Sequence, residues 1–242
     1  EHVDLVLANR DDRPSEVLLN DGHGNFDQRM VLGNGGDLTR AVLVADLNGD
    51  GHLDIVAGNI GQPNVIYFGD GRGGFGGGDN FGRVDGNTYA LAKADMDNDG
   101  DVDLVEGNVE QQNAVYFNQG NGKLYREARF GAESDATYGL DVGDLDGDGD
   151  LDLVAAGSGM LYINHNARPS LASWLKVKPL TASGAESVFG ARVDVVCVGG
   201  CASPWRGVRV IDGGSGYRSQ NAYDAHFGLP NANATYNVTV RW

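Results

Sequence analysis

The sequence predicts an all-β protein in two parts, a partial β-propeller over residues 1–168 and a small all-β module over residues 169–242. Three observations predict this fold. An acidic loop recurs at a fixed interval; short β-branched and aromatic runs, bounded by Gly, Asn and Asp, surround each loop; and the period stops near Pro169. A repeat near 50 residues with several short strands suits a propeller blade, and a solenoid is the alternative.

The acidic loops begin at Asp46, Asp95 and Asp144, which gives a repeat of 49 residues. Each loop has side-chain oxygens at positions 1, 3, 5 and 9 and glycine at position 6. This spacing surrounds a hard cation with oxygen, and Ca²⁺ is the natural candidate. A solvated acidic tail would show no repeated ligand spacing, so the loops are better explained as local metal sites.

Each repeat is expected to contain the same strands in the same order. An approach strand leads into the acidic loop, a short apolar strand leaves it, and a third strand ends in a glycine hairpin whose last apolar residue begins the next strand. The approach strands are expected over 39–45, 88–94 and 137–143, the third strands over 17–19, 64–68, 114–117 and 160–163, and the hairpins over 20–26, 69–75 and 118–124.

An EF-hand is the stronger alternative explanation of the acidic loops, because its loop begins with the same ligand spacing. It requires a bidentate Glu at position 12 and a helix on each side. Position 12 is Ala57, Glu106 and Ala155 in the three loops, so only one fits. Glycine and β-forming residues also follow each loop where a helix would continue, and the EF-hand is therefore rejected.

Residues 1 to about 168 resemble the FG-GAP/VCBS repeats, the blades of integrin-type β-propellers, because the loop Asp-x-Asp/Asn-x-Asp-Gly-x-x-Asp recurs three times in register. The resemblance implies one Ca²⁺ site between the first two strands of each blade, about three ions in all. The side-chain ligands that it implies are Asp46, Asn48, Asp50 and Asp54 in the first loop, Asp95, Asp97, Asp99 and Asp103 in the second, and Asp144, Asp146, Asp148 and Asp152 in the third. The backbone carbonyls of His52, Asp101 and Asp150 would complete the shells.

The first repeat starts in its middle, since Asp4 corresponds to position 9 of a loop whose earlier ligands are absent. Propellers of this family usually have seven blades, and only about three and a half are visible. We therefore expect a piece of a longer protein, with closure supplied by upstream blades.

Composition excludes several partners. The net charge of −16 disfavours binding to nucleic acid or to an anionic membrane, and no apolar run approaches the ~18 residues of a membrane helix.

Cys197 and Cys201 favour a disulfide across a glycine turn, with two reduced thiols as the alternative. Asn233 and Asn237 begin Asn-x-Thr sequons, which would carry glycans only in a protein secreted by a eukaryote.

The C-terminal part reads as strands over 173–178, 191–197, 206–211 and 234–242. In the last strand, Tyr236, Val238, Val240 and Trp242 are expected to face a core, while Asn237 and Thr239 face solvent. The segments Trp174-Leu-Lys-Val, Gly190-Ala-Arg-Val, 213–221 and His226-Phe-Gly-Leu resemble the ASPIC/UnbV module. A chain in which FG-GAP/VCBS-like repeats are followed by this module resembles the cartilage acidic protein family and its microbial relatives.

No catalytic set stands out. Ser215, Asp224 and His226 invite a hydrolase hypothesis, but Gly-Gly-Ser-Gly lacks the second glycine of a nucleophile elbow. A turn is the favoured explanation, and the alternative is a polar ligand surface built from Arg209, Tyr217, Gln220 and Asn221.

The sequence therefore favours a non-enzymatic, secreted, Ca²⁺-binding repeat protein that serves adhesion or recognition of an extracellular protein or glycan. Three alternatives stay open. One is a lectin-like protein whose Tyr89, Tyr138 and Tyr217 stack on sugars. The others are an enzyme or accessory subunit with catalytic residues upstream, and a structural subunit of a larger extracellular assembly.

Overall fold

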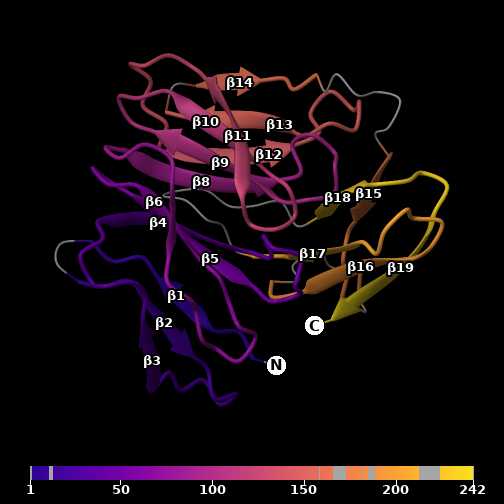
Figure 1. Ribbon diagram of the computed structural model, residues 1–242, viewed down its shortest axis with the longest axis horizontal. Coiled ribbons are helices and arrows are strands. Elements are labelled where there is room, and N and C mark those ends of the chain that lie inside the picture. The colour runs from indigo at the N-terminus through magenta and orange to yellow at the C-terminus, as the bar shows by residue number, and fades with distance from the viewer. Residues whose placement is uncertain are drawn as a thin grey trace.

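The computed structural model describes residues 2–10, 13–157, 159–165, 173–181, 183–184, 189–212 and 224–241. Within these ranges, every regular element is a β-strand, and the strands form six sheets. The all-β prediction is confirmed. Four sheets follow one another along the chain and fit a partial, propeller-like array (Figure 1).

The four sheets are named blades 1 to 4. Blade 1 contains β1 (Leu5–Leu7), β2 (Glu16–Leu19) and β3 (Gln28–Val31). Blade 2 contains β4 (Thr39–Ala45), β5 (Asp54–Asn59), β6 (Asn64–Tyr67) and β7 (Asp79–Phe81). Blade 3 contains β8 (Thr88–Ala94), β9 (Asp103–Asn108), β10 (Asn113–Asn118) and β11 (Leu124–Phe130). Blade 4 contains β12 (Gly139–Gly143), β13 (Asp152–Ala156) and β14 (Met160–Tyr162). Each blade is an antiparallel meander in sequence order.

Apolar cores lie between neighbouring blades, and they explain why the middle strands are apolar on both faces. Blades 1 and 2 share a core that includes Val17 and Ile55. Blades 2 and 3 share one around Leu43 and Leu104, and blades 3 and 4 share another that includes Leu153. Since β8 also lies against both β4 and β12, the first strand of each of these blades faces the same side of the array.

The end blades keep one apolar face open. Leu5 of blade 1 is 43% exposed, and Leu161 of blade 4 is 55% exposed. Their counterparts in blades 2 and 3 are covered by the next sheet, because every residue of β5, β6, β9 and β10 is buried.

The C-terminal module contains two small sheets around one core of Val193, Ala225, Phe227 and their neighbours. Its strands are β15 (Ser173–Val177), β16 (Arg192–Gly199), β17 (Arg206–Val210), β18 (Ala225–Leu229) and β19 (Thr235–Arg241). Leu175 and Val177 pack on the core as expected, and so do Tyr236 and Val240. The expectation for Val238 was wrong: it is 45% exposed, because none of the described strands covers that part of β19.

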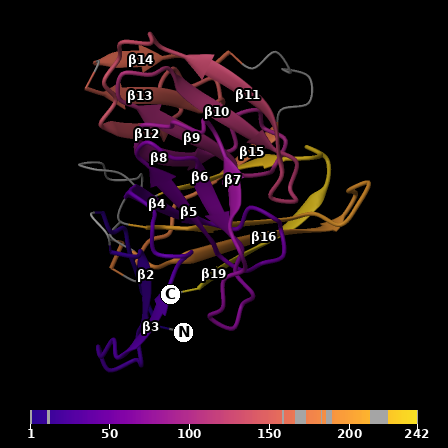
Figure 2. The same cartoon turned by 60° about the vertical axis from the view of Figure 1, so that its left-hand side comes forward.

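The module lies beside the blade array and adds no further blade. Figure 1 shows β15 to β19 to the right of the blades, and Figure 2 shows β15, β16 and β19 beside them in a second view. The expected boundary at residues 168 and 169 falls outside the described residues. In the part of the chain that the structure describes, no helix is long and apolar enough to cross a membrane.

Candidate metal centres

The acidic loops connect the first two strands of blades 2, 3 and 4. They are named loop 1 (46–54), loop 2 (95–103) and loop 3 (144–152). Their tight winding needs left-handed backbone at positions 4 and 6. Asn98, at position 4 of loop 2, has φ of 56°, and this conformation suits Asn better than most other side chains. The position-6 glycines Gly51, Gly100 and Gly149 have φ of 89°, 101° and 92°.

The aspartate at position 1 is held by backbone amides of its own loop. Asp46 accepts from the amides of Gly49 and Gly51, at 2.9 Å each. Asp95 accepts in the same way from the Asp99 and Gly100 amides at 3.0 Å each. These bonds curl the loop around the carboxylate and turn further oxygens toward the same point.

The aspartate at position 9 joins the loop to its blade. Asp54, Asp103 and Asp152 are each 0% exposed. One carboxylate oxygen of each accepts a hydrogen bond from the backbone amide at loop position 2, at 2.8 Å. The other oxygen accepts from a backbone amide at the end of the third strand or just after it, at 2.8–3.0 Å; the donors are Gly69, Asn118 and Asn164. These hydrogen bonds fix both ends of each loop to its blade.

Burial makes these carboxylates costly to ionise in the absence of a cation. It raises the pKa of Asp103 to about 9, with the charges of Asp95 and Asp97 adding to the effect. Burial likewise raises the pKa of Asp95 to about 7 and that of Asp54 to about 6. A bound cation would remove this cost, because it favours the ionised carboxylates.

Loops 2 and 3 bring carboxylate oxygens together as a metal site requires. Single oxygens of Asp95, Asp97 and Asp99 all lie within 4.8 Å of one another, and so do those of the aspartates at positions 1, 3 and 9 of loop 3. The donor set consists of hard oxygen ligands, which suits Ca²⁺ or Mg²⁺ better than softer metals.

The remaining predicted ligands lie in the same loops. Asn48 in loop 1 accepts from the Asp50 amide at 3.1 Å, and Asp50 accepts from the His52 amide at 2.8 Å. The position-5 aspartates of loops 2 and 3, Asp99 and Asp148, accept from the amides of Asp101 and Asp150 at 3.0 and 2.9 Å. Asp146 and Asp148 also approach His165, and the ligand atoms of these three side chains lie within 4.8 Å of one another. The sequence pattern did not indicate this histidine.

Links between the loops also escaped the sequence analysis. Asn118 donates to the Leu47 carbonyl at 2.7 Å, and Asn164 donates to the Met96 carbonyl at 2.9 Å, so blades 3 and 4 are each tied to the loop of the preceding blade. Asn98 donates to Asp150 at 2.6 Å and joins loop 2 to loop 3. The sequence carries a partial signal, since an asparagine follows or ends the third strand in blades 1, 3 and 4, at Asn20, Asn118 and Asn164, but the partner of each side chain is set by blade packing.

Arg209, the one described member of the expected polar ligand surface, is half-buried between the module and loop 2. Its Nη2 is buried and has no hydrogen-bond partner among the described residues, while Nε donates to the His226 carbonyl and Nη1 to the Val208 carbonyl. The carboxylates of Asp95 and Asp103 lie close enough to interact with its charge. Tyr217, Gln220 and Asn221, which were expected beside it, lie outside the described residues.

The hydrolase set is not assembled by the described residues. Asp224 pairs with Lys176 at 3.1 Å, and Ser215 lies outside the described residues. His226 is 9% exposed and stacks on Trp174, and burial together with the Arg209 charge lowers its pKa to about 4. The imidazole is therefore neutral and packed.

Cys197 and Cys201 form a disulfide at the end of β16. Asn233 and Asn237 are both exposed, Asn233 in the turn before β19 and Asn237 on that strand. Their attachment to glycans stays a prediction.

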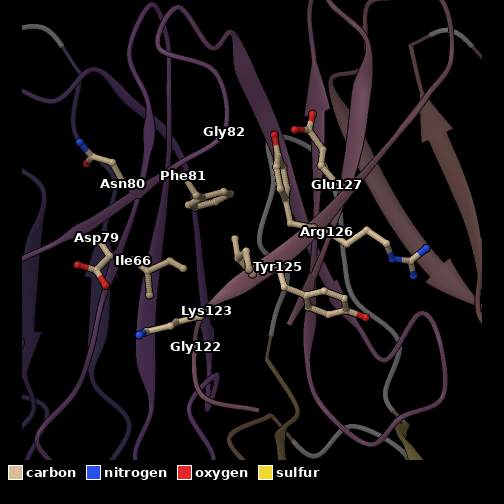
Figure 3. Close-up of a pocket in the computed structure, with 12 residues that line it drawn as sticks. Ile66, Asp79, Asn80, Phe81, Gly82, Gly122, Lys123, Tyr125, Arg126 and Glu127 are labelled. Atoms are coloured by element: carbon tan, nitrogen blue, oxygen red, sulfur yellow. The ribbon is translucent and has the colours of Figure 1, made fainter. Parts of the chain in front are cut away.

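A groove of about 600 Å³ runs between the outer strands of blades 2 and 3. Figure 3 shows Phe81 and Ile66 in its middle, Asp79 and Asn80 on one side, and Tyr125 with its neighbours on the other. Tyr125 is 45% exposed. The groove thus combines aromatic faces with polar side chains.

Comparison with known proteins identifies both parts of the chain. Residues 1–57, 46–106 and 95–155 each match the FG-GAP-like repeat family, and residues 182–242 match the family described as ASPIC and UnbV. No curated protein matches the chain. One similar solved structure is the V. cholerae biofilm matrix protein Bap1, with 14% identity, a TM-score of 0.38 and coverage of 93% of this chain. The chain spans 46% of the length of that protein. The three matches in register with the acidic loops show that the chain belongs to the FG-GAP-like repeat proteins and carries a C-terminal ASPIC/UnbV module.

Proposed function

We propose that this protein is a non-enzymatic, extracellular Ca²⁺-binding repeat protein that serves adhesion or recognition. One observation carries the proposal: converging carboxylates recur in the same loop of blades 3 and 4, and each of the three loops ends in a fully buried aspartate at position 9. The family membership supports it, and the disulfide is consistent with an oxidising compartment.

The residues would act as follows. The carboxylates at positions 1, 3 and 5 would hold the ion, with Asn48 replacing one of them in loop 1, and the position-9 aspartate would connect the ion to the blade. Ca²⁺ supplies positive charge that offsets the repulsion among these groups. An ion that binds only the folded state stabilises it by about 2.7 kcal/mol per site at a hundredfold excess over Kd. Sites in extracellular modules often have Kd of roughly 10⁻⁴–10⁻³ M.

Calorimetry on the metal-stripped protein tests the proposal. We expect three Ca²⁺ ions per chain and a rise in Tm, with Mg²⁺ binding more weakly. The triple variant Asp46→Asn, Asp95→Asn, Asp144→Asn should lose binding, while Asp79→Asn, which removes an exposed charge from β7, should bind as the wild type does. An unchanged melting curve in excess chelator would refute the structural role of the ion.

A carbohydrate ligand is the second candidate, and the groove between blades 2 and 3 favours it. Sugars bind where an aromatic face adjoins polar side chains, and Tyr125 and Asp79 border the same groove. A glycan array with the wild type and Tyr125→Ala tests this candidate. The absence of any bound glycan, or binding that Tyr125→Ala leaves intact, would remove it.

A further inference from the structure

The C-terminal module touches the same position in all three acidic loops. At each position-6 glycine, a Cβ atom would collide with one side chain of the module. The pairs are Gly51 with Arg206, Gly100 with Trp205, and Gly149 with Trp174. The same glycine of each 49-residue repeat is therefore in contact with the module. The three contacting side chains, however, come from a part of the chain that has no such repeat.

At loop 1, the contact is a set of directed polar bonds. Arg192 Nη2 donates to the Gly51 carbonyl oxygen at 2.7 Å. Asp194, which is 3% exposed, accepts from both Arg192 and Arg206 at 2.5–3.2 Å. This carboxylate holds the two guanidinium groups against the loop.

At loop 2, the module binds a metal-ligand side chain itself. The Gly228 amide donates to Asp95 Oδ2 at 2.6 Å, beside the bond from the Gly100 amide of the loop. A Cβ atom on Gly228 would collide with this Asp95 oxygen and with the backbone of Asn98. The module thus fixes the orientation of the first ligand of the loop.

Charge favours the same arrangement with an ion in place. Loop 2 contains five aspartates, at 95, 97, 99, 101 and 103. One divalent ion balances only two of these charges, so the loop still attracts Arg209 after the ion has bound. The guanidinium and the ion therefore add to each other in neutralising the loop.

We propose that the three acidic loops form the docking surface of the C-terminal module, and that cation binding and module docking strengthen each other. This inference rests on the proposed function, namely Ca²⁺ in the loops. The ion orders a loop that the module must fit, and the module pre-orients Asp95 for the ion. Linkage makes the coupling reciprocal, so a change at the module must alter affinity at the loop.

A pair of glycine substitutions in the full chain tests the coupling. Gly228→Ala places a methyl group against loop 2. Gly199→Ala is the matched control: Gly199 also lies in a strand of the module, but a Cβ atom on it would meet nothing within 4 Å. Neither glycine has a positive φ. We expect Gly228→Ala to weaken Ca²⁺ binding at one of the three sites about tenfold, within the usual range for coupled sites. Gly199→Ala should leave all three affinities unchanged.

Tryptophan fluorescence gives a second readout that does not depend on the folding of Gly228→Ala. Trp205 and Trp174 lie against Gly100 and Gly149, so their emission should change as Ca²⁺ fills loops 2 and 3. Trp205→Phe should remove the part of the signal that follows loop 2, while calorimetry still records the ion.

The outcomes separate the two proposals. If the wild type binds no Ca²⁺, the proposed function fails, and the coupling fails with it. If Ca²⁺ binds but tryptophan emission stays constant, or if Gly228→Ala binds all its ions as tightly as Gly199→Ala does, the coupling alone is overturned.

Discussion

Loops 2 and 3 share one motif, yet their surroundings differ. Asp95 and Asp97 of loop 2 are 1% and 7% exposed, whereas Asp146 and Asp148 of loop 3 lie at the surface. Loop 2 lies between the two neighbouring loops and accepts the Gly228 amide of the C-terminal module, while loop 3 belongs to the end blade. Identical ligand spacing therefore produces one buried and one accessible site.

The comparison shows that neighbours, more than the motif, set the electrostatics of a repeated site. Burial raises the pKa of Asp95 to about 7 because blades, loop and module together exclude water from it. A cation in such a site relieves a larger cost than one in an exposed loop does. We therefore expect loop 2 to contribute most to Ca²⁺-dependent stability.

The largest expected difference is between Asp95→Ala and Asp144→Ala in saturating Ca²⁺. Asp95→Ala removes an ion and also leaves the Gly100 and Gly228 amides without their acceptor, so it should cost about 4 kcal/mol of unfolding free energy. Asp144→Ala should cost about half as much. Urea unfolding measures both variants. Equal losses would show that the buried surroundings of loop 2 add nothing.

The blades around the loops should differ in a similar way. Leu104 of blade 3 is 0% exposed between two sheets, so Leu104→Ala should destabilise the protein by about 3 kcal/mol. Leu161→Ala, on the open face of blade 4, should cost about 0.5 kcal/mol or less. Urea unfolding of both variants checks this. A large cost at Leu161 would mean that the open face is covered in solution.

A smaller effect concerns the pH dependence of blade 3. Glu106 accepts from Asn64 and Asn108 at 2.8 and 2.7 Å, and burial raises its pKa. The folded protein therefore retains a proton that the unfolded chain releases above about pH 4.3. This contribution to stability is complete at lower pH and is lost as the pH rises through the folded pKa.

The variant Glu106→Gln removes that titration. Relative to the wild type, its unfolding free energy should rise as the pH increases from about 4.3. Unfolding curves in saturating Ca²⁺ measure it, since the ion keeps the loop carboxylates ionised in the folded state. Parallel pH profiles for the two proteins would show that Glu106 does not titrate differently on folding.

Much of the blade fold could be predicted from sequence because it depends on local signals. The approach strand over 39–45 matches β4, and the strand over 88–94 matches β8, since apolar residues and glycine turns delimit both. The strand expected over 137–143 begins at Gly139 instead. Val238 was misplaced because alternation indicates which residues share a face, and it does not tell whether another element covers that face.

The sequence by itself determined the repeat, the strand order and the oxygen-bearing side chains of each loop, because these depend on residue type and spacing within about ten positions. Only the tertiary structure decided which loops are buried, that Asn118 ties one blade to the loop of another, and that Trp205 and Gly228 meet loop 2. These contacts join segments more than 60 residues apart, as Asn118 and Leu47 do, and some join segments more than 100 apart, as Gly228 and Asp95 do. No short-range pattern records such contacts, because they arise when blades and module exclude water from their shared surfaces.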